Sequence, residues 1–108
     1  MKGIEFLGTS LKTVREFPAL AKKEAGYQLD RVQHGLDPTD WKPMKSVGQG
    51  VREIRIQHEG QYRLIYVASH QEKVYVLHAF QKKTQKTGKQ DLDAAKRALN
   101  EVLERQRP

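Results

Sequence analysis

Two arginines occupy consecutive segments whose residues follow a strand-like pattern. Arg55 lies in residues 51–57, where polar and apolar side chains alternate, and Arg63 lies in residues 61–68, which are apolar on both faces. Because successive side chains of a strand point to opposite faces, Arg55 shares a face with Glu53. A charged side chain inside a small sheet costs free energy unless it meets water or a partner. Arg63 is therefore expected either in a buried ion pair with Glu53 or, with Arg55, in a cleft that grips a phosphate, since the planar guanidinium binds two oxygens at once.

A lysine-rich segment without acidic residues follows a third strand-like segment, residues 73–80. It contains Lys82, Lys83, Lys86 and Lys89. In isolation such a segment is most often a solvated loop. Here it leaves a strand expected beside the one that carries Arg63, and it leads into the N-terminus of a predicted helix, whose free N–H groups favour anions. These features together indicate phosphate binding.

Aromatic side chains are interleaved with the cations on the predicted strands. Tyr62 and Tyr66 lie on the same segment as Arg63, and Arg52 stands on the preceding one. Phenol rings that stack on bases beside basic groups are typical of single-stranded RNA sites, so Tyr62, Tyr66 and Arg52 join the predicted RNA-binding residues. The alternative is that the rings pack in the core, which is the interpretation favoured for Tyr75.

Metal, thiol and nucleotide-loop chemistries have no support in the sequence. The chain has no cysteine, which excludes disulfides, thiolate zinc sites and a cysteine nucleophile. Its histidines, His34, His58, His70 and His78, lack the spacing of metal ligands. Residues 46–50 hold two glycines but lack the lysine and hydroxyl residue of a phosphate-binding P-loop. We therefore expect neither a metal site nor a cofactor.

Length and charge set the class of protein. With 108 residues the chain is expected to form one domain, residues 1–108. Lys and Arg total 20 against 13 Asp and Glu, and the net charge of +7 indicates polyanionic partners, nucleic acid first among them. The apolar runs are too short to span a membrane, and residues 1–10 lack the apolar core of a secretory signal. A cytoplasmic protein with no membrane partner is expected.

The order of periodic segments predicts an α+β fold. The expected elements are a strand at Ile4–Leu7, a short helix capped by Thr9 or Ser10, a helix over Pro18–His34 with Gly35 as its C-cap, a loop over Leu36–Gly50 anchored by Trp41 and Met44, the three strands, and a helix from a Thr87–Gln90 capping box to about Arg105. Short polar turns at residues 58–60 and 70–72 join the strands into an antiparallel meander. Grouped helices followed by grouped strands favour this β-α-α-β-β-β-α order over a doubly wound sheet.

Five segments, taken in order, resemble the phage-derived, HigB-like branch of the RelE/ParE toxin superfamily. They are residues 24–29 (EAGYQL), 37–45 (DPTDWKPMK), 51–56 (VREIRI), 62–66 (YRLIY) and 76–87 (VLHAFQKKTQKT). The resemblance covers nearly the whole chain, and the strand segments are fairly specific in combination. It implies an antiparallel sheet with two N-terminal helices on one side and a C-terminal helix, in agreement with the predicted order.

The resemblance also implies a function. RelE and HigB members are toxins of type II toxin–antitoxin pairs that enter the ribosome and cut mRNA without a metal. The ribose 2′-OH attacks the adjacent phosphorus, which leaves a 2′,3′-cyclic phosphate and a 5′-OH. The chain is accordingly expected to be an endoribonuclease that inhibits translation, with the ribosome, mRNA and a cognate helix-turn-helix antitoxin as partners. A ParE-like gyrase poison and a noncatalytic RNA-binding module stay open as alternatives.

Site residues carry over from the family by position. Arg63 matches the sheet arginine that contacts the scissile phosphate, and Arg55 matches a basic residue of the preceding strand. Lys83 matches the basic residue just after the last strand, with Lys82 beside it. Glu53 stands where RelE carries a lysine and is the expected acceptor of the 2′-OH proton.

The chain departs from the family pattern near its C-terminus. The late tyrosine of RelE has no counterpart, and Lys89 lies near that position. HigB-type sites use a late histidine and aspartate, whereas this chain has no histidine after His78, and Asp91 and Asp93 begin a predicted helix. The predicted catalytic residues are Arg63, Arg55, Lys83 and Glu53, and the predicted RNA-binding residues are Lys82, Lys86, Lys89, Arg52, Tyr62 and Tyr66.

Overall fold

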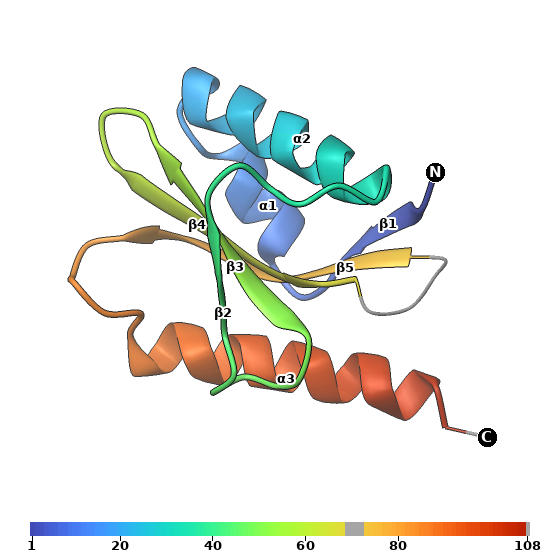
Figure 1. The fold of residues 1–108 in the computed structure, drawn as a ribbon. Helices are drawn as coiled ribbons and strands as arrows, with labels where there is room; N and C mark the ends of the chain where they lie inside the picture. Colours follow the sequence, from blue (N-terminus) through green and yellow to red (C-terminus); the bar gives the residue numbers. More distant parts are fainter. Residues whose placement is uncertain (69–72, 108) are drawn as a thin grey trace.

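The chain folds into a mixed sheet with helices on both faces, as Figure 1 shows. The computed structural model describes residues 1–68 and 73–107. In chain order the elements are β1 (Gly3–Phe6), α1 (Ser10–Arg15), α2 (Ala19–Gln33), β2 (Trp41–Pro43), β3 (Val51–Gln57), β4 (Gln61–Val67), β5 (Lys73–Lys82) and α3 (Lys89–Arg105). The predicted α+β class is confirmed. Across the described residues, no helix has the length and apolar character that a membrane span requires.

The five strands form one sheet in the order β1-β5-β4-β3-β2. Strand β4 lies at the centre, antiparallel to both β3 and β5. This follows from its sequence, because every residue of β4 after Gln61 is buried and such a strand needs cover on both faces. The predicted meander of β3, β4 and β5 is therefore confirmed, although its turn at residues 70–72 lies outside the described residues.

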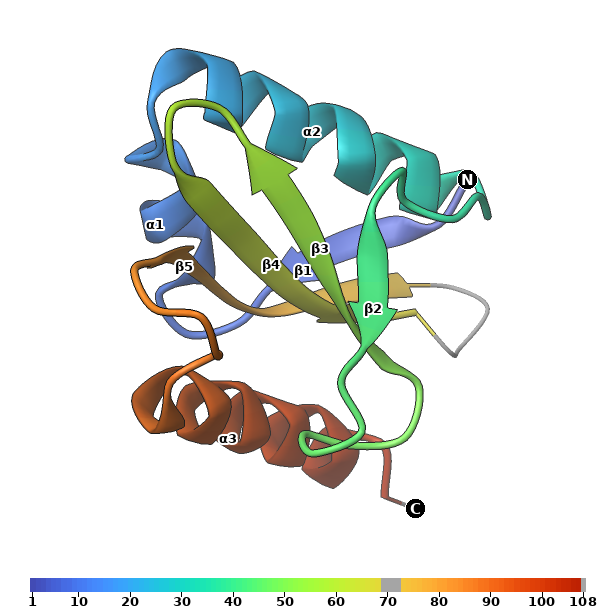
Figure 2. The ribbon, with the colours of Figure 1, turned by 60° about the vertical axis from the view of Figure 1, so that its left-hand side comes forward.

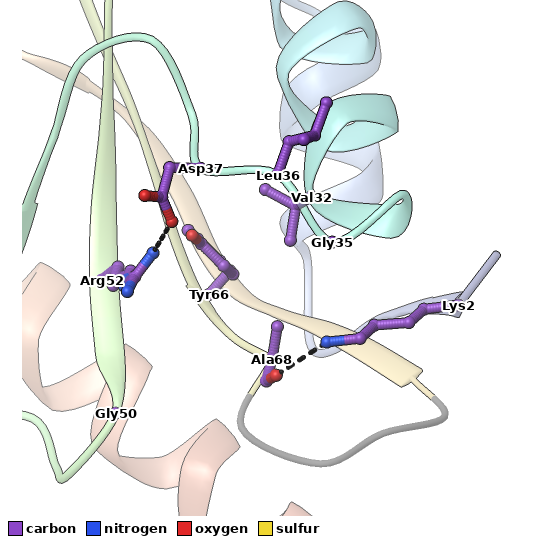
Figure 3. A pocket seen from close by; sticks show the side chains of 9 residues that line it. All are labelled: Lys2, Val32, Gly35, Leu36, Asp37, Gly50, Arg52, Tyr66 and Ala68. Carbon is purple, nitrogen blue, oxygen red and sulfur yellow. Dashed lines mark hydrogen bonds and ion pairs between the residues drawn. The ribbon is translucent and has the colours of Figure 1, made fainter.

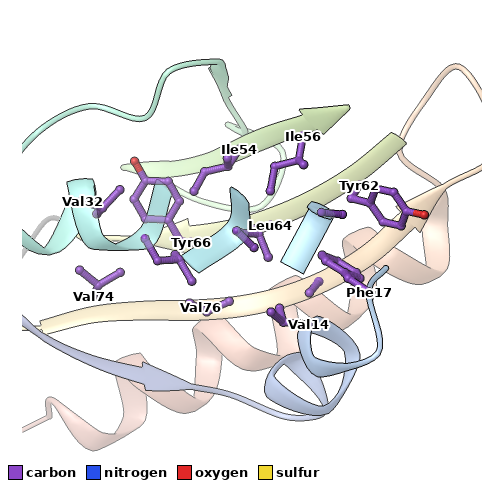
Figure 4. Packing of buried hydrophobic residues seen from close by; sticks show 14 residues of the cluster. Val14, Phe17, Val32, Ile54, Ile56, Tyr62, Leu64, Tyr66, Val74 and Val76 are labelled. Carbon is purple, nitrogen blue, oxygen red and sulfur yellow. The ribbon is translucent and has the colours of Figure 1, made fainter. Parts of the chain in front are cut away.

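The sheet separates two hydrophobic cores. Helices α1 and α2 cover one face and α3 covers the other, as the two views in Figures 1 and 2 agree. Alternation along β4 divides its side chains between them: Tyr62, Leu64 and Tyr66 join the core under α1 and α2, shown in Figure 4, whereas Ile65 and Val67 join the core under α3.

Helix α2 follows the predicted pattern closely. Its buried residues Ala21, Ala25, Leu29 and Val32 recur at helical spacing and face the sheet. The helix ends within one residue of its predicted C-terminus, and Gly35 follows with a φ of 81°, a left-handed conformation that glycine adopts without strain.

A β-bulge in β5 changes which face its C-terminal half presents. Ile65 of β4 pairs with His78, but the next residue, Tyr66, pairs with Val76, so Leu77 is an extra residue. Before the bulge, Val76 points into the core under α1 and α2; after it, Phe80 points to the α3 side. The bulge thereby places Lys82, two residues after Phe80, on the same face as Arg63.

Three local features differ from the sequence-based expectations. The predicted loop over residues 36–50 contains β2, which pairs with β3, although Met44 is buried within it as expected. Strand β1 runs parallel to β5, so the sheet is not wholly antiparallel. The N-cap of α3 is Gly88 and not the predicted Thr87, so no side chain caps the helix, and the hydroxyl of Thr87 donates to Glu53.

Glu5 ties the edge strand β1 to the rest of the fold. Its carboxylate pairs with Lys73 of β5 at 3.4 Å and accepts a hydrogen bond from Arg105 near the end of α3. The Arg105 hydrogen bond, reinforced by Lys73, holds the pKa of Glu5 below its ordinary value of 4.5. A carboxyl group whose pKa is lower in the folded state stabilises the fold above its unfolded pKa and loses that contribution in acid.

We expect Glu5→Gln to lower the free energy of unfolding at neutral pH by less than about 1 kcal/mol, the range of a largely solvated ion pair. The difference from the wild type should shrink as the pH falls below 4.5 and the wild-type carboxylate takes up its proton. Urea unfolding at several pH values measures this, with Glu16→Gln as an exposed control. A difference that does not depend on pH would contradict the assignment.

Candidate functional site

The register of β3 and β4 brings two cations face to face. Arg55 pairs directly with Arg63, and Glu53, two residues earlier on the same face, pairs with Ile65. On the other side of β3, Lys42 of β2 stands opposite Glu53. The strands thus assemble a cluster of three cations and one carboxylate on the face that α3 covers.

Arg63 is buried yet not fully engaged. It is 5% exposed, its Nη1 donates to the carbonyl of Tyr62 at 3.0 Å, and its Nη2 donates to Gln61 Oε1 at 3.2 Å. Its Nε lies 3.7 Å from Glu53 Oε1, and neither atom has a hydrogen-bond partner among the described residues. Burial lowers the pKa of Arg63, the charge of Glu53 opposes that effect, and Arg55 adds to it. Because a guanidinium has five N–H donors, Arg63 keeps donors for a ligand.

Glu53 is a buried hub, which overturns its predicted role. It has no exposed surface, lies 3.7 Å from Lys42 Nζ, and accepts a 2.8 Å hydrogen bond from the hydroxyl of Thr87. A carboxylate enclosed in this way has no surface to offer a substrate, so its position does not support the expectation that Glu53 accepts the 2′-OH proton. Its carboxylate instead supplies the counter-charge that allows Arg63 to be buried.

A groove opens at Arg63, between the end of the sheet and the segment that leads to α3. One pocket of about 410 Å³ is lined by Gln61, Arg63, Lys82, Lys83, Thr84 and Gln85. A second pocket of about 410 Å³ shares Lys82, Lys83 and Thr84 and extends past Lys86 and Lys89 to Asp91 at the start of α3. We call the two together the lysine groove. Of the predicted residues, it gathers Arg63, Lys82, Lys83, Lys86 and Lys89.

The electrostatics of the lysine groove favour an anion. Burial lowers the pKa of Lys82, and repulsion from the neighbouring charge of Arg63 lowers it further. A bound anion would relieve that repulsion. Lys89, at the far end, is exposed and paired with Asp93 at 2.9 Å, so the strongest concentration of unpaired charge lies between Arg63 and Lys83.

Arg55 lies beside the groove without lining either pocket. Its exposed guanidinium makes two hydrogen-bond-length contacts with Asp40 Oδ1, at 3.0 Å from Nε and 2.9 Å from Nη2. The residues Arg55, Arg63 and Lys83, predicted to form one cluster, therefore lie in the same region. Arg63 and Lys83 face the groove, and Arg55 lies at its border.

Arg52, one residue before Glu53, is on the opposite face of the sheet. Figure 3 shows its side chain in a pocket of about 280 Å³ beneath the end of α2, where Nη1 donates to Asp37 at 2.8 Å. The guanidinium also stacks 3.8 Å from the ring centroid of Trp41. With both groups engaged and the sheet between Arg52 and Arg63, the predicted RNA-binding role of Arg52 is not supported by its position.

Tyr62 and Tyr66 are core residues. Their side chains are 5% and 2% exposed in the core under α1 and α2, and the ring of Tyr62 packs against Phe17 at a centroid distance of 4.8 Å. Burial also raises the pKa of Tyr66. Both rings pack in the core, as the alternative interpretation has it, so their positions do not support the predicted RNA-stacking role.

No sequence pattern indicated one contact at the start of α3. His78 Nε2 lies 2.8 Å from Asp91 Oδ1, and the His78 ring stacks on Phe80 at 5.5 Å. The pair fixes the first turn of α3 to β5 and so holds the far wall of the groove. The contact depends on the bulge at Leu77, which turns His78 toward α3.

The described residues contain no group of three or more side chains able to hold a metal ion. The side chains that line the lysine groove supply guanidinium and ammonium groups to an anion. The sequence pattern did not identify two further members of the site, Lys42 and Thr87. Lys42 was expected in a loop, and Thr87 was expected to cap a helix.

Comparison with protein families gives one match. The family described as phage-derived protein Gp49-like (DUF891) matches residues 12–100, a span that holds every residue of the groove. No curated protein matches the chain. The match confirms the phage-derived part of the resemblance, while the assignment to HigB-like toxins stays a prediction.

We expect Glu53 and Arg63 to be strongly coupled in stability. Arg63→Met leaves a buried carboxylate without its guanidinium and should cost about 3 kcal/mol of unfolding free energy. The double variant Glu53→Gln with Arg63→Met should cost at least about 1 kcal/mol less than the sum of the two single changes. Urea denaturation measures all three. The pair Arg63→Met with Glu16→Gln is a control and should be additive; additivity at Glu53 would refute the coupling.

Proposed function

Because the chain belongs to the Gp49-like family of phage-derived proteins, a family associated with RelE-like toxins, we propose that it is the toxin of a type II toxin–antitoxin pair. Its activity in this proposal is the cleavage of mRNA on the ribosome, without a metal, which arrests translation. The observation that carries the proposal is the lysine groove, where Arg63 is held by a buried carboxylate beside Lys82 and Lys83.

This arrangement suits a phosphodiester that gains negative charge as it reacts. When the 2′-OH attacks the adjacent phosphorus, the P–O5′ bond breaks, and the products are a 2′,3′-cyclic phosphate and a 5′-OH. The phosphorane between them carries extra charge that fixed guanidinium and ammonium groups stabilise better than water does. Arg63 can do so without reorganisation because its side chain is already clamped by Tyr62, Gln61 and Glu53.

Proton transfer completes the reaction. The 2′-OH must lose a proton and the departing 5′ oxygen must gain one. Glu53 is enclosed, so we assign the proton exchange to Lys82. The lowered pKa of Lys82 eases exchange of a proton with the substrate. Alignment of the 2′-OH with the phosphorus is assigned to the ribosome, which holds the mRNA, and effective alignment contributes several kcal/mol.

The partners follow from this activity. mRNA and the ribosome are both polyanions, in keeping with a net charge of +7. A cognate helix-turn-helix antitoxin would neutralise the toxin by covering the groove or the sheet edge. Action on translating ribosomes would place the protein in the cytoplasm.

One observation favours a second candidate, a noncatalytic polyanion binder or a ParE-like gyrase poison. The described residues that line the pocket at Arg63 include neither a carboxylate nor an imidazole, the usual carriers of protons in catalysis. Such a protein would grip a nucleic acid phosphate without cutting RNA.

We expect expression of the chain to stop translation and to produce transcripts with new 5′-OH ends. Arg63→Lys keeps a positive charge beside Glu53 but removes the planar guanidinium that binds two phosphate oxygens at once. This change should lower the rate of mRNA cleavage by a factor on the order of 10². Arg15→Lys on α1, across the sheet, is the matched control. Mapping of transcript ends after induction decides the matter. Intact mRNA with double-strand DNA breaks would favour the gyrase poison, and intact mRNA and DNA would favour the binding module.

RNA affinity should depend on the protonation of Lys82. Because its pKa lies below the ordinary 10.5, raising the pH neutralises Lys82 before a typical lysine, and the phosphate contact weakens as the pH rises. We expect a loss of about tenfold in affinity for a single-stranded 2′-O-methyl RNA, as for one charge-assisted hydrogen bond. Lys82→Arg stays protonated and should not show this step. Fluorescence anisotropy at fixed ionic strength is the measurement, and an identical step in Lys82→Arg would contradict it.

A further inference from the structure

The segment between β5 and α3, residues 83–88, is held to the sheet by one side chain. We call it the lysine loop, since it carries Lys83 and Lys86. The hydroxyl of Thr87 donates to Glu53 Oε2 at 2.8 Å, and no other hydrogen bond joins this loop to the sheet within the described residues. Thr84 also bonds, but only within the loop, to the carbonyl of Lys86 at 2.7 Å.

The acceptor of that hydrogen bond is the carboxylate that faces Arg63. Glu53 has no exposed surface; Oε2 receives Thr87, while Oε1 lies 3.7 Å from both Arg63 Nε and Lys42 Nζ. Oε1 and Arg63 Nε lack hydrogen bonds, so the bond from Thr87 is the one short contact of this buried charge. Hydrogen bonds to an ionised group away from water are among the strongest in proteins.

The start of α3 leaves Thr87 outside the helix. A side chain that caps a helix stands at the N-cap and accepts a hydrogen bond from a free N–H group of the first turn. The N-cap of α3 is Gly88, so Thr87 lies one residue before it and donates to Glu53. Its hydroxyl thereby tethers the loop at the floor of the groove.

We propose that Thr87 is a positioning residue whose bond to Glu53 holds the lysine loop over Arg63, so that cations from the loop and from the sheet meet the same phosphate. The inference rests on the proposed function to the extent that the phosphate is that of RNA. Thr87 itself does not need to touch the substrate. It acts by fixing Lys83, which would otherwise have to be ordered at the moment of binding.

Limited trypsin digestion tests the tether without any RNA. Thr87→Val removes the hydroxyl at nearly constant shape, and cleavage after Lys83 and Lys86 should become about tenfold faster, the effect of losing one strong hydrogen bond. Thr87→Ser keeps the hydroxyl and should digest like the wild type. Thr9→Val, in the exposed N-cap of α1, is the control. Melting temperatures identify a variant that fails to fold.

RNA binding tests the consequence for the groove. With a noncleavable 2′-O-methyl RNA, Thr87→Val should bind about tenfold more weakly than the wild type, while the dependence of affinity on salt stays the same, because no charge is lost. Lys83→Ala should instead reduce the salt slope by about one. Thr87→Ser should restore wild-type affinity. This pattern separates a positioning role from a general loss of stability.

The outcomes also separate this inference from the proposed function. Equal trypsin rates in Thr87→Val and the wild type, or equal RNA affinities, would overturn the inference even if the wild type cuts mRNA. Binding that depends on Thr87 without any cleavage would support the inference and defeat the nuclease. A wild type that binds no RNA would overturn the link to RNA, whatever the trypsin rates.

Discussion

Arg55 and Arg63 oppose each other across adjacent strands, and the rest of the site follows from this repulsion. Like charges at paired positions of a sheet destabilise it unless other groups compensate. Asp40 compensates Arg55 at the surface, and Glu53 compensates Arg63 in the interior. An apolar helix face cannot cover such a cluster, so α3 packs its buried residues Ala95, Ala98 and Val102 over the apolar part of the sheet. A polar loop takes its place at Arg63, and the groove is the space this leaves.

Residues of strongly periodic segments could be predicted from the sequence. Repeating patterns of apolar residues predict the bounds of β3, the central place of β4 and the apolar face of α2. These patterns arise because apolar side chains have to be buried between the sheet and the helices. Arg63 stood out for the same reason, as a charge in a strand buried on both faces. The neighbourhood of Arg63, Lys82 and Lys83 could therefore be anticipated, because short turns leave few ways to arrange three consecutive strands.

The remaining features depend on tertiary contacts that leave no local pattern. Strand β2 is three residues long and exists because β3 offers an edge. Thr87 had the sequence of a helix cap, but the N-cap falls on Gly88 and the hydroxyl of Thr87 donates to the buried carboxylate of Glu53. Tyr62 and Tyr66 have the alternation of a stacking surface and of a core alike, and only the position of α1 and α2 decides between them.

Net charge alone is a poor guide to where this protein binds anions. Many cations are committed to acidic neighbours, such as Arg52 to Asp37 and Arg105 to Glu5. What distinguishes the lysine groove is that Arg63, Lys82 and Lys83 line one pocket. Membership of the Gp49-like family limits the classes of function, but proteins with one fold serve several activities. The specific function therefore has to be inferred from the arrangement of these few side chains.

The bulge at Leu77 makes chain length part of the protein's function. If β5 paired with β4 through Leu77 without interruption, Phe80 and Lys82 would lie on the face under α1 and α2, and the groove would lose a cation. Deletion of Leu77 itself would join Val76 to His78 and keep Phe80 opposite Arg63 and Lys82 opposite Gln61, whereas loss of a residue between His78 and Lys82 would turn Lys82 to the other face. Homologues in this family are therefore best compared by the number of residues between the position of His78 and the first lysine after it, since that interval records whether this lysine and the central arginine share a surface.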